Sequence, residues 1–321
     1  MEKEKIHNPL KQEKKNKILT GTLIALIISV SIILLLSSNR SAVDKERFRI
    51  ANLAEVDKVV FESNERVELV FNGSRWLVDE DYRADDQLVT VLFATLQQVE
   101  AKRKVAASMV DSIARSLREN GVKVSLYRGS NLEGEFIAGG NAAKTEAYFM
   151  DSKEEPFVMT IPGYRVYVSG IFELDQKGWR DKRIFNFNWR NFKSLHAQFN
   201  GADAQSFQVE DLGNGFDILN TTGTDTTKLN DYLDAVSLLV AKDFIRPGKN
   251  KAYDSMLQTT PELTIEISDL GDNKFTLDIY HPLEGDELVA GKLNGSEGVV
   301  FDIRQVASIL RARQYFMASR P

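Results

Sequence analysis

The chain has 321 residues, 43% of them hydrophobic, with seven prolines and no cysteine. This composition is that of a globular protein and excludes a largely disordered chain, while the lack of cysteine excludes disulfide and thiolate chemistry. The net charge of −5 is uneven, because residues 1–17 carry six lysines and three glutamates and leave residues 18–321 with −8. Since affinity for nucleic acid depends on neutralising phosphates, we expect no nucleic-acid partner.

Residues 18–39 form the first predicted element. They make an uninterrupted run without a charge, between Lys17 and Arg40. A helix of about 20 apolar residues spans a hydrocarbon layer of ~30 Å, and this run is long enough to do so. We therefore predict a single transmembrane helix over residues 18–39.

The charges that flank this run predict its orientation. Six lysines precede it, and four basic residues follow it closely, at Arg40, Lys45, Arg47 and Arg49. The excess favours a cytoplasmic tail over residues 1–17, with the bulk of the chain on the periplasmic side of a bacterial inner membrane. A cleaved signal peptide is the alternative, but it requires a shorter apolar region and an A-x-A-like cleavage site, which residues 36–40 do not provide.

Beyond residue 45 the chain shows four similar modules. Each begins with a hairpin whose residues alternate between apolar and polar, as half-buried strands do. The hairpins lie at residues 59–71, 122–137, 207–219 and 263–280. A helix with apolar residues at helical spacing follows the first hairpin, with Asp85 as its N-cap, and a similar helix follows the third about 141 residues later, behind Thr226 or Thr227. The modules therefore pair as two repeats.

The second and fourth modules complete the predicted fold. The second continues with a strand at residues 164–168, and the fourth with a strand at 298–301 and a helix at 303–316. The fold class is α+β, with antiparallel sheets whose inner faces are covered by helices. The predicted domains follow the tail (1–17) and the transmembrane helix (18–39) with a first half over 45–185 and a second half over 186–321, joined near residues 186–193.

Several segments of this chain resemble a known family. They are the N-terminal anchor, Val56–Phe61, Arg75–Val78, Ala84–Val89, Val166–Tyr167 and Trp179–Phe185. Together they resemble the DUF4340-type envelope domain of unknown function, over most of residues 45–245. The resemblance implies an accessory envelope protein that works with an ABC transporter of the gliding-motility type. It implies no catalytic residues.

The residues give no sign of a cofactor, a metal site or a catalytic centre. The three histidines, His7, His196 and His281, lie apart, whereas a zinc site needs three or four ligands. The acidic residues between Asp79 and Asp86 lack the glycine and spacing of a calcium loop, so we interpret them as a solvated turn with a helix N-cap. No G-x-S-x-G motif is present.

The segment from residue 179 to residue 193 interleaves basic and aromatic residues at the predicted joint. Arg and Trp are frequent anchors of protein interfaces, and basic residues grip lipid headgroups. The alternative is a structural segment whose aromatic rings are buried while the basic side chains reach outward. The candidate contacts with a partner or a membrane surface are Trp179, Arg180, Lys182, Arg183, Trp189, Arg190 and Lys193.

Three functions remain open from the sequence. The first is a non-catalytic, membrane-anchored protein that binds a protein partner, with an ABC transporter permease or auxiliary subunit implied by the resemblance. The second is a module that binds a cell-wall or polysaccharide ligand through the 179–193 segment. The third is a hydrolase that uses carboxylates such as Asp79, Asp81 or Asp85.

Overall fold

The computed structural model describes residues 9–38, 43–50, 52–185, 190–213, 215–283 and 285–318, and within the first helix the side chains of residues 17–32. The chain divides into two compact units. One comprises Met1–Arg66 with Thr90–Glu173, and the other comprises Val67–Val89 with Leu174–Pro321.

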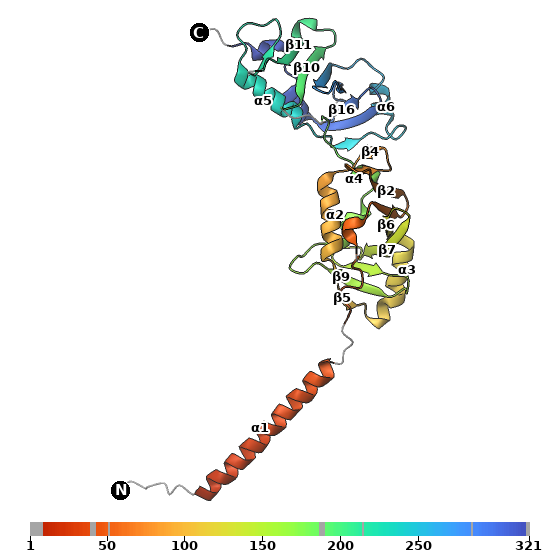
Figure 1. Ribbon diagram of the computed structural model, residues 1–321, viewed down its shortest axis with the longest axis vertical. Helices are drawn as coiled ribbons and strands as arrows, with labels where there is room; N and C mark the ends of the chain where they lie inside the picture. The colour runs from red at the N-terminus through yellow and green to blue at the C-terminus, as the bar shows by residue number, and fades with distance from the viewer. Residues whose placement is uncertain are drawn as a thin grey trace, which may run out of the picture. The chain divides into compact units, whose positions relative to one another are not determined.

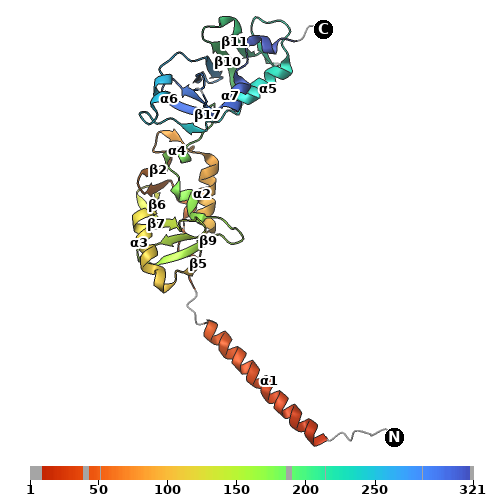
Figure 2. The ribbon, with the colours of Figure 1, turned by 180° about the vertical axis from the view of Figure 1, so that it is seen from behind.

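Helix α1 (Pro9–Ser38) contains almost all of the predicted 18–39 helix and begins well before it. Its apolar side chains are exposed, for example Leu19 at 73% and Leu23 at 60%. Figures 1 and 2 show it as one uninterrupted helix. Among the residues whose side chains are described, no helix is both long enough and apolar enough to cross a membrane.

The first sheet has nine strands in the order β4-β3-β2-β1-β6-β7-β8-β9-β5. Neighbouring strands run antiparallel, as where Val60 lies opposite Ser125 and Ala138 opposite Phe149. The strands are β1 (Lys58–Glu62), β2 (Arg66–Phe71), β3 (Trp76–Val78), β4 (Tyr82–Arg83), β5 (Glu100–Lys104), β6 (Val122–Arg128), β7 (Asn131–Gly140), β8 (Ala147–Met150) and β9 (Pro156–Thr160).

Helices lie on both faces of the first sheet (Figures 1 and 2). On one face, helix α3 packs Ile113 and Leu117 against Tyr148, Met150 and Val158. The other face holds a cluster of phenylalanine rings, made by Phe48, Phe136, Phe149, Phe157 and Phe172. The helices of this part are α2 (Asp86–Gln98), α3 (Val110–Asn120) and α4 (Gln176–Trp179), with 3₁₀ turns η1 (Leu53–Glu55), η2 (Ala107–Met109) and η3 (Val168–Glu173).

The second sheet has eight strands in the order β12-β11-β10-β14-β15-β16-β17-β13. Its strands are β10 (Phe192–Phe199), β11 (Phe207–Asp211), β12 (Phe216–Ile218), β13 (Asp243–Phe244), β14 (Leu263–Asp269), β15 (Lys274–Ile279), β16 (Leu288–Leu293) and β17 (Glu297–Asp302). The other elements are α5 (Thr226–Ser237), α6 (Lys251–Met256) and α7 (Ile303–Ile309), with η4 (Asp203–Gln205) and η5 (Arg313–Phe316).

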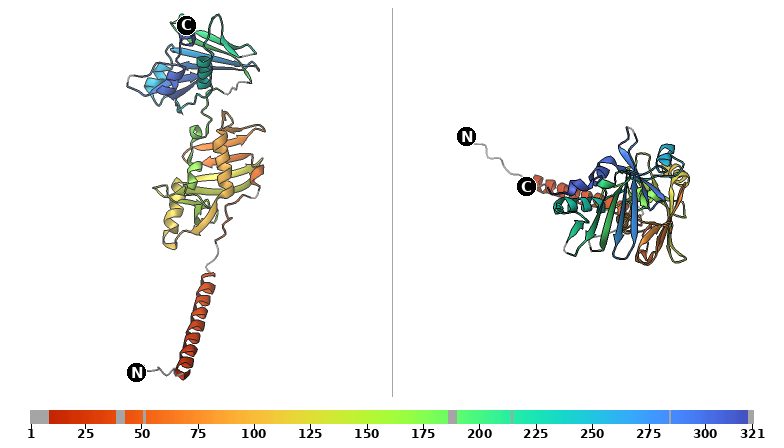
Figure 3. Two further views of the ribbon diagram at one scale, coloured as in Figure 1. Left: turned by 90° about the vertical axis from the view of Figure 1, so that its left-hand side faces the viewer. Right: turned by 90° about the horizontal axis from the view of Figure 1, so that it is seen from above.

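The second sheet also buries apolar residues on both faces. Leu229 and Leu233 of α5 and Val306 of α7 share one core with the inward side chains of the strands. Val289 belongs to that core, whereas the next residue, Ala290, packs with Leu257 after α6, because successive side chains of a strand point to opposite faces. Figure 3 shows α5 lying across the strands of this sheet.

The order of the strands is the same in the two sheets once β4 is set aside. Backbone hydrogen bonds match as well: Ala101 N donates to Lys45 O, and Ala241 N likewise donates to a lysine carbonyl, that of Lys182. Asp181 N donates to Arg83 O in the same way that Ala318 N donates to Gly223 O. We call residues 45–181 the first repeat and residues 182–318 the second repeat.

Three predictions about the elements were wrong. The predicted strand at 164–168 is absent, since no strand covers these residues, Val166 is 55% exposed and η3 begins at Val168. The predicted 303–316 helix ends at Ile309, and a 3₁₀ turn then brings Phe316 into the core. Helix α5 takes Asp225 rather than a threonine as its N-cap, since the Asp225 carboxylate accepts a hydrogen bond from Lys228 N.

The hairpins at residues 122–137 and 263–280 are confirmed as β6–β7 and β14–β15. The predicted hairpin at 207–219 is β11–β12, but β10 precedes it and pairs with β11, so the first hairpin of the second repeat is β10–β11. The predicted joint falls partly outside the described residues, since residues 186–189 belong to it.

Candidate functional site

The predicted contact residues fall into different environments. Trp179 is fully buried and Arg180 is 7% exposed, so neither presents its side chain on the described surface. Lys182 is half-buried, whereas Arg183, Arg190 and Lys193 are exposed. Trp189 lies outside the described residues. The basic side chains after residue 181 therefore form the accessible part of the predicted set.

Short backbone pairings position this segment within the second unit. Asp175 caps α4 by accepting a 2.8 Å hydrogen bond from Gly178 N. Asp85 N then donates to the carbonyl of Trp179 at 2.8 Å, and Ala84 bridges Arg180. We call residues 181–184 the strap. The strap also pairs with the segment that follows α5: Ile184 N donates to Leu239 O, and Ala241 N donates to Lys182 O.

Arg180 lies between two aromatic rings. Its guanidinium carbon is 3.7 Å from the centroid of the Tyr82 ring and 3.6 Å from that of the Phe244 ring. Its Nη2 atom is 2.6 Å from Oε1 of Glu297, whose side chain is 30% exposed. A planar guanidinium can stack on aromatic faces and pair with a carboxylate at the same time, which a lysine ammonium cannot do.

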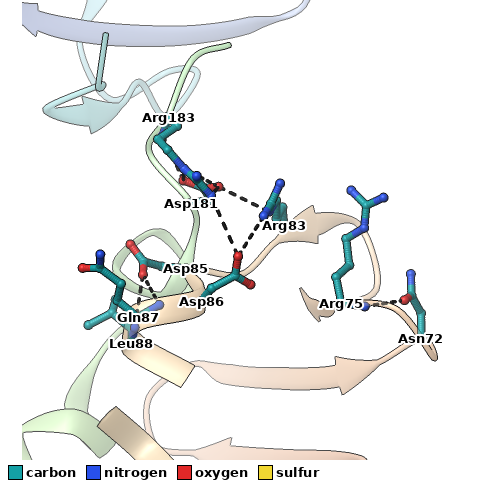
Figure 4. A network of polar contacts seen from close by, with 9 residues as sticks. All are labelled: Asn72, Arg75, Arg83, Asp85, Asp86, Gln87, Leu88, Asp181 and Arg183. Atoms are coloured by element: carbon teal, nitrogen blue, oxygen red, sulfur yellow. Dashed lines mark hydrogen bonds and ion pairs between the residues drawn. The ribbon is translucent and has the colours of Figure 1, made fainter. Parts of the chain in front are cut away.

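Four charged side chains, two of them from the strap, form an ion-pair cluster (Figure 4). Arg83 is 2.8 Å from Asp86 and 3.3 Å from Asp181, and Arg183 is 2.7 Å from Asp181 and 3.9 Å from Asp86. Burial by itself would raise the pKa of Asp181. The hydrogen bonds and charge of Arg183, helped by Arg83, outweigh burial and hold the pKa of Asp181 below its ordinary value.

A cavity of about 400 Å³ lies at this cluster. Its size falls within the ~300–1,000 Å³ typical of small-molecule sites. The strap supplies one part of its lining and the start of α2 supplies another. The lining residues are Asp85, Asp86, Gln87, Asp181, Lys182, Arg183 and Val240. The cavity lining therefore offers carboxylates, an amide and two cations together with apolar surface.

Asp85 and Asp79 both accept hydrogen bonds that stabilise the local structure. The carboxylate of Asp85 accepts hydrogen bonds from Gln87 N at 2.8 Å and Leu88 N at 3.1 Å, as the predicted N-cap of α2 does (Figure 4). Asp79 accepts from Glu68 N and from the Gln176 amide. Within the described part of the chain, no group of three histidine, aspartate or glutamate side chains is placed to hold a metal ion.

The partners of Arg180 have no signal in the sequence. Tyr82, Phe244 and Glu297 come from three different strands, β4, β13 and β17. Each stands in an ordinary strand context, and no local spacing links them to residue 180. A long-range contact of this kind leaves no signal in a single sequence.

One family model matches the chain. It covers residues 76–256, from β3 to the end of α6, and thus includes α2, the strap and the second repeat as far as Met256. Neither a curated protein nor a solved structure shows significant similarity to the chain. Because the matched region is more than half of the sequence, the chain belongs to the DUF4340 family, whose description is a domain of unknown function.

Proposed function

We propose that this protein is a membrane-anchored, non-catalytic accessory protein of the bacterial envelope. The observation that carries the proposal is the uncharged run at residues 18–39, which lies almost entirely in α1. Consecutive apolar side chains of α1, from Leu26 to Ile28, are more than half exposed, so the helix has no water-facing polar side there. A helix that is apolar all round is stable in a bilayer or a protein core.

The tail 1–17 then lies in the cytoplasm and the two repeats lie outside the inner membrane, as the lysine-rich start favours. The repeats bind a protein partner through three exposed cations, Arg183, Arg190 and Lys193. An ABC transporter permease or auxiliary subunit is the proposed partner. This choice is supported by the sequence resemblance to envelope proteins that accompany such transporters.

Membrane attachment is tested on the full chain by fractionation. We expect the protein to remain with membranes after washing at high salt and alkaline pH, and to be released only by detergent. N-terminal sequencing of the purified protein should find the residues before Arg40 retained. Release by salt, or a mature chain that begins beyond Arg40, would contradict the anchor.

The partner is tested by purification of the full chain from detergent. We expect an ABC permease or auxiliary subunit to copurify with the wild type and to be lost with Lys193→Glu. Lys274→Glu is the matched control, because Lys274 is also exposed and pairs with one carboxylate, that of Glu266, as Lys193 pairs with Asp272. Equal recovery with both variants would remove the 190–193 region from the interface.

A second candidate function is the binding of a polar glycan in the cavity beside α2. The 400 Å³ volume and the mixture of carboxylate, amide and cation favour a ligand rich in hydroxyl groups. The segment's described aromatic rings Trp179, Phe185 and Phe192 are buried, so they offer no stacking platform. A thermal-shift screen against cell-wall glycans tests this function, since a ligand raises the melting temperature by mass action, and Gln87→Ala should abolish the shift.

A further inference from the structure

The surroundings of Arg180 differ from those of its counterpart in the second repeat. Ala84 bridges Arg180 in the first repeat, and Thr224 bridges Met317 in the second. The preceding residues are equivalent too, because Asp85 N donates to Trp179 O and Asp225 N donates to Phe316 O. Met317 is neutral and 40% exposed, whereas Arg180 is charged and 7% exposed. The repeat fold therefore does not require a cation at this position.

A buried guanidinium has two favourable environments, one with its ion-pair partner and one in water. Removal of one partner from a buried pair leaves an uncompensated charge, which is strongly destabilising, whereas replacement of the charge by an apolar side chain of similar volume is often neutral. Arg180 has Glu297 at 2.6 Å and rings on both sides, so the Glu297 carboxylate and the two rings compensate for the burial of its charge. Loss of the Glu297 charge would therefore leave the guanidinium more favourably placed in water than between the rings.

The strap follows Arg180 directly and depends on where that residue lies. Asp181 N donates to Arg83 O at 2.8 Å, so the first strap residue is held on the strand that also carries Tyr82. The strap residues Asp181, Lys182 and Arg183 line the 400 Å³ cavity. Movement of Arg180 into water would displace the strap and remove that part of the lining.

We propose that Arg180 and Glu297 form an electrostatic latch that holds the strap, residues 181–184, over the cavity. The latch is closed while the guanidinium is stacked between Tyr82 and Phe244 and paired with Glu297. It opens when the charge of Glu297 is removed, because the unpaired cation then leaves the rings for water. The strap pairings and the cavity lining are lost in the open state. The latch does not depend on the identity of the partner or on the membrane anchor.

Amide hydrogen exchange on the detergent-solubilised full chain tests the latch. The reporters are the amides of Asp181, Ile184 and Ala241, which make the strap pairings. Glu297→Gln should accelerate their exchange by about tenfold or more, because local opening becomes frequent. Arg180→Met, which copies the residue of the second repeat, should leave their exchange within about threefold of the wild type, and the double variant should match Arg180→Met.

The amides of β14 and β15 serve as the internal control, since Ile265 and Leu277 lie opposite each other in the core of the second sheet. Arg183→Met is the matched variant, because it removes an exposed strap cation without touching the stacked pair. It should not reproduce the effect of Glu297→Gln. If Glu297→Gln does not fold, Glu297→Asp replaces it, since the shorter side chain withdraws the carboxylate from Arg180, and the strap amides should then exchange faster than in the wild type while the β14–β15 amides do not.

Three results would overturn the latch. The first is unchanged strap exchange in the Glu297 variant. The second is equal acceleration in Arg180→Met and Glu297→Gln, which would make Arg180 a packing residue whose charge is irrelevant. The third is equal acceleration of the strap and of the β14–β15 amides, which would mean unfolding of the whole unit.

Discussion

The two repeats end in the same way but continue differently. Trp179 and Phe316 are both fully buried, and each offers its carbonyl to the N–H of an aspartate that caps the long helix of its repeat. One residue later the first repeat has a buried, stacked arginine and the second has a half-exposed methionine. What the repeats share is required by the fold. What only one of them has, such as the buried Arg180, is where we look for function.

The largest effect is expected where the repeats agree. Trp179→Ala and Phe316→Ala should each lower the free energy of unfolding by about 3–5 kcal/mol, because both leave a large cavity in a packed core. Urea denaturation followed by circular dichroism measures the loss. A loss below about 1 kcal/mol for one of them would mean that the two positions are not equivalent.

A smaller effect is expected at the helix caps. Asp85→Ala should lower the free energy of unfolding by about 1 kcal/mol, because two N–H groups at the start of α2 lose their acceptor. Asp225→Ala should act in the same direction on α5. Asp86→Ala is the control, because this neighbour is exposed and makes an ion pair instead of a cap. An equal loss at Asp85 and Asp86 would argue against capping as the cause.

The repeats also differ inside the core. Counted from the capping aspartates Asp85 and Asp225, Tyr232 of α5 stands at the position that Leu92 has in α2. The Tyr232 hydroxyl is buried, and within the described residues it has no hydrogen-bond partner. Burial raises the pKa of Tyr232 above its ordinary value. Tyr232→Phe should therefore leave stability unchanged or raise it by up to about 1 kcal/mol.

Tyr253→Phe provides the comparison for this variant. The Tyr253 hydroxyl donates a 2.6 Å hydrogen bond to Asp286, so its loss should lower stability by about 1 kcal/mol. Thermal melts of both variants measure the difference. A clear destabilisation by Tyr232→Phe would show that its hydroxyl has a partner after all.

The smallest effect concerns acid stability at the strap. The pKa of Asp181 is lowered below 3.8 in the folded protein, so its carboxylate is protonated more readily in the unfolded chain. It therefore contributes stability above about pH 3.8, and the contribution disappears as the pH falls through the lowered pKa. Asp181→Asn should be less stable than the wild type at neutral pH, and the gap should shrink on acidification below pH 3.8. Because the site is partly exposed, the gap is small. A gap that does not depend on pH would assign the loss to packing.

The strands that could be predicted from the sequence are those with one face towards solvent. β14 alternates buried and half-buried residues along its whole length, and its turn residues are polar, so its hairpin was predicted from the sequence. β8 is buried at all four positions and β9 at four of five, so neither carries a period of two. Strands buried on both faces look like any short apolar run, and these two were missed.

The candidate site was predictable only in part. The gathering of basic and aromatic residues predicts Lys182 and Arg183 as contacts with a partner or a membrane surface, which stays a prediction, and the structure places both at a cavity. The same pattern also selected Trp179, which is core. The alternation of aromatic and basic residues indicates which side chains are apolar, but it does not predict which aromatic rings contact Arg180. That contact depends on strands that lie far from Arg180 in the sequence, such as β13.

The central claim is that one helix anchors the chain and leaves both repeats outside the cytoplasm. Its most direct test is a pair of reporters fused after Pro321 of the full chain, alkaline phosphatase and green fluorescent protein. The account predicts an active phosphatase and a dark fluorescent protein, because the phosphatase needs the oxidising periplasm to form its disulfides. Bright fluorescence with an inactive phosphatase would place the repeats in the cytoplasm and contradict the account.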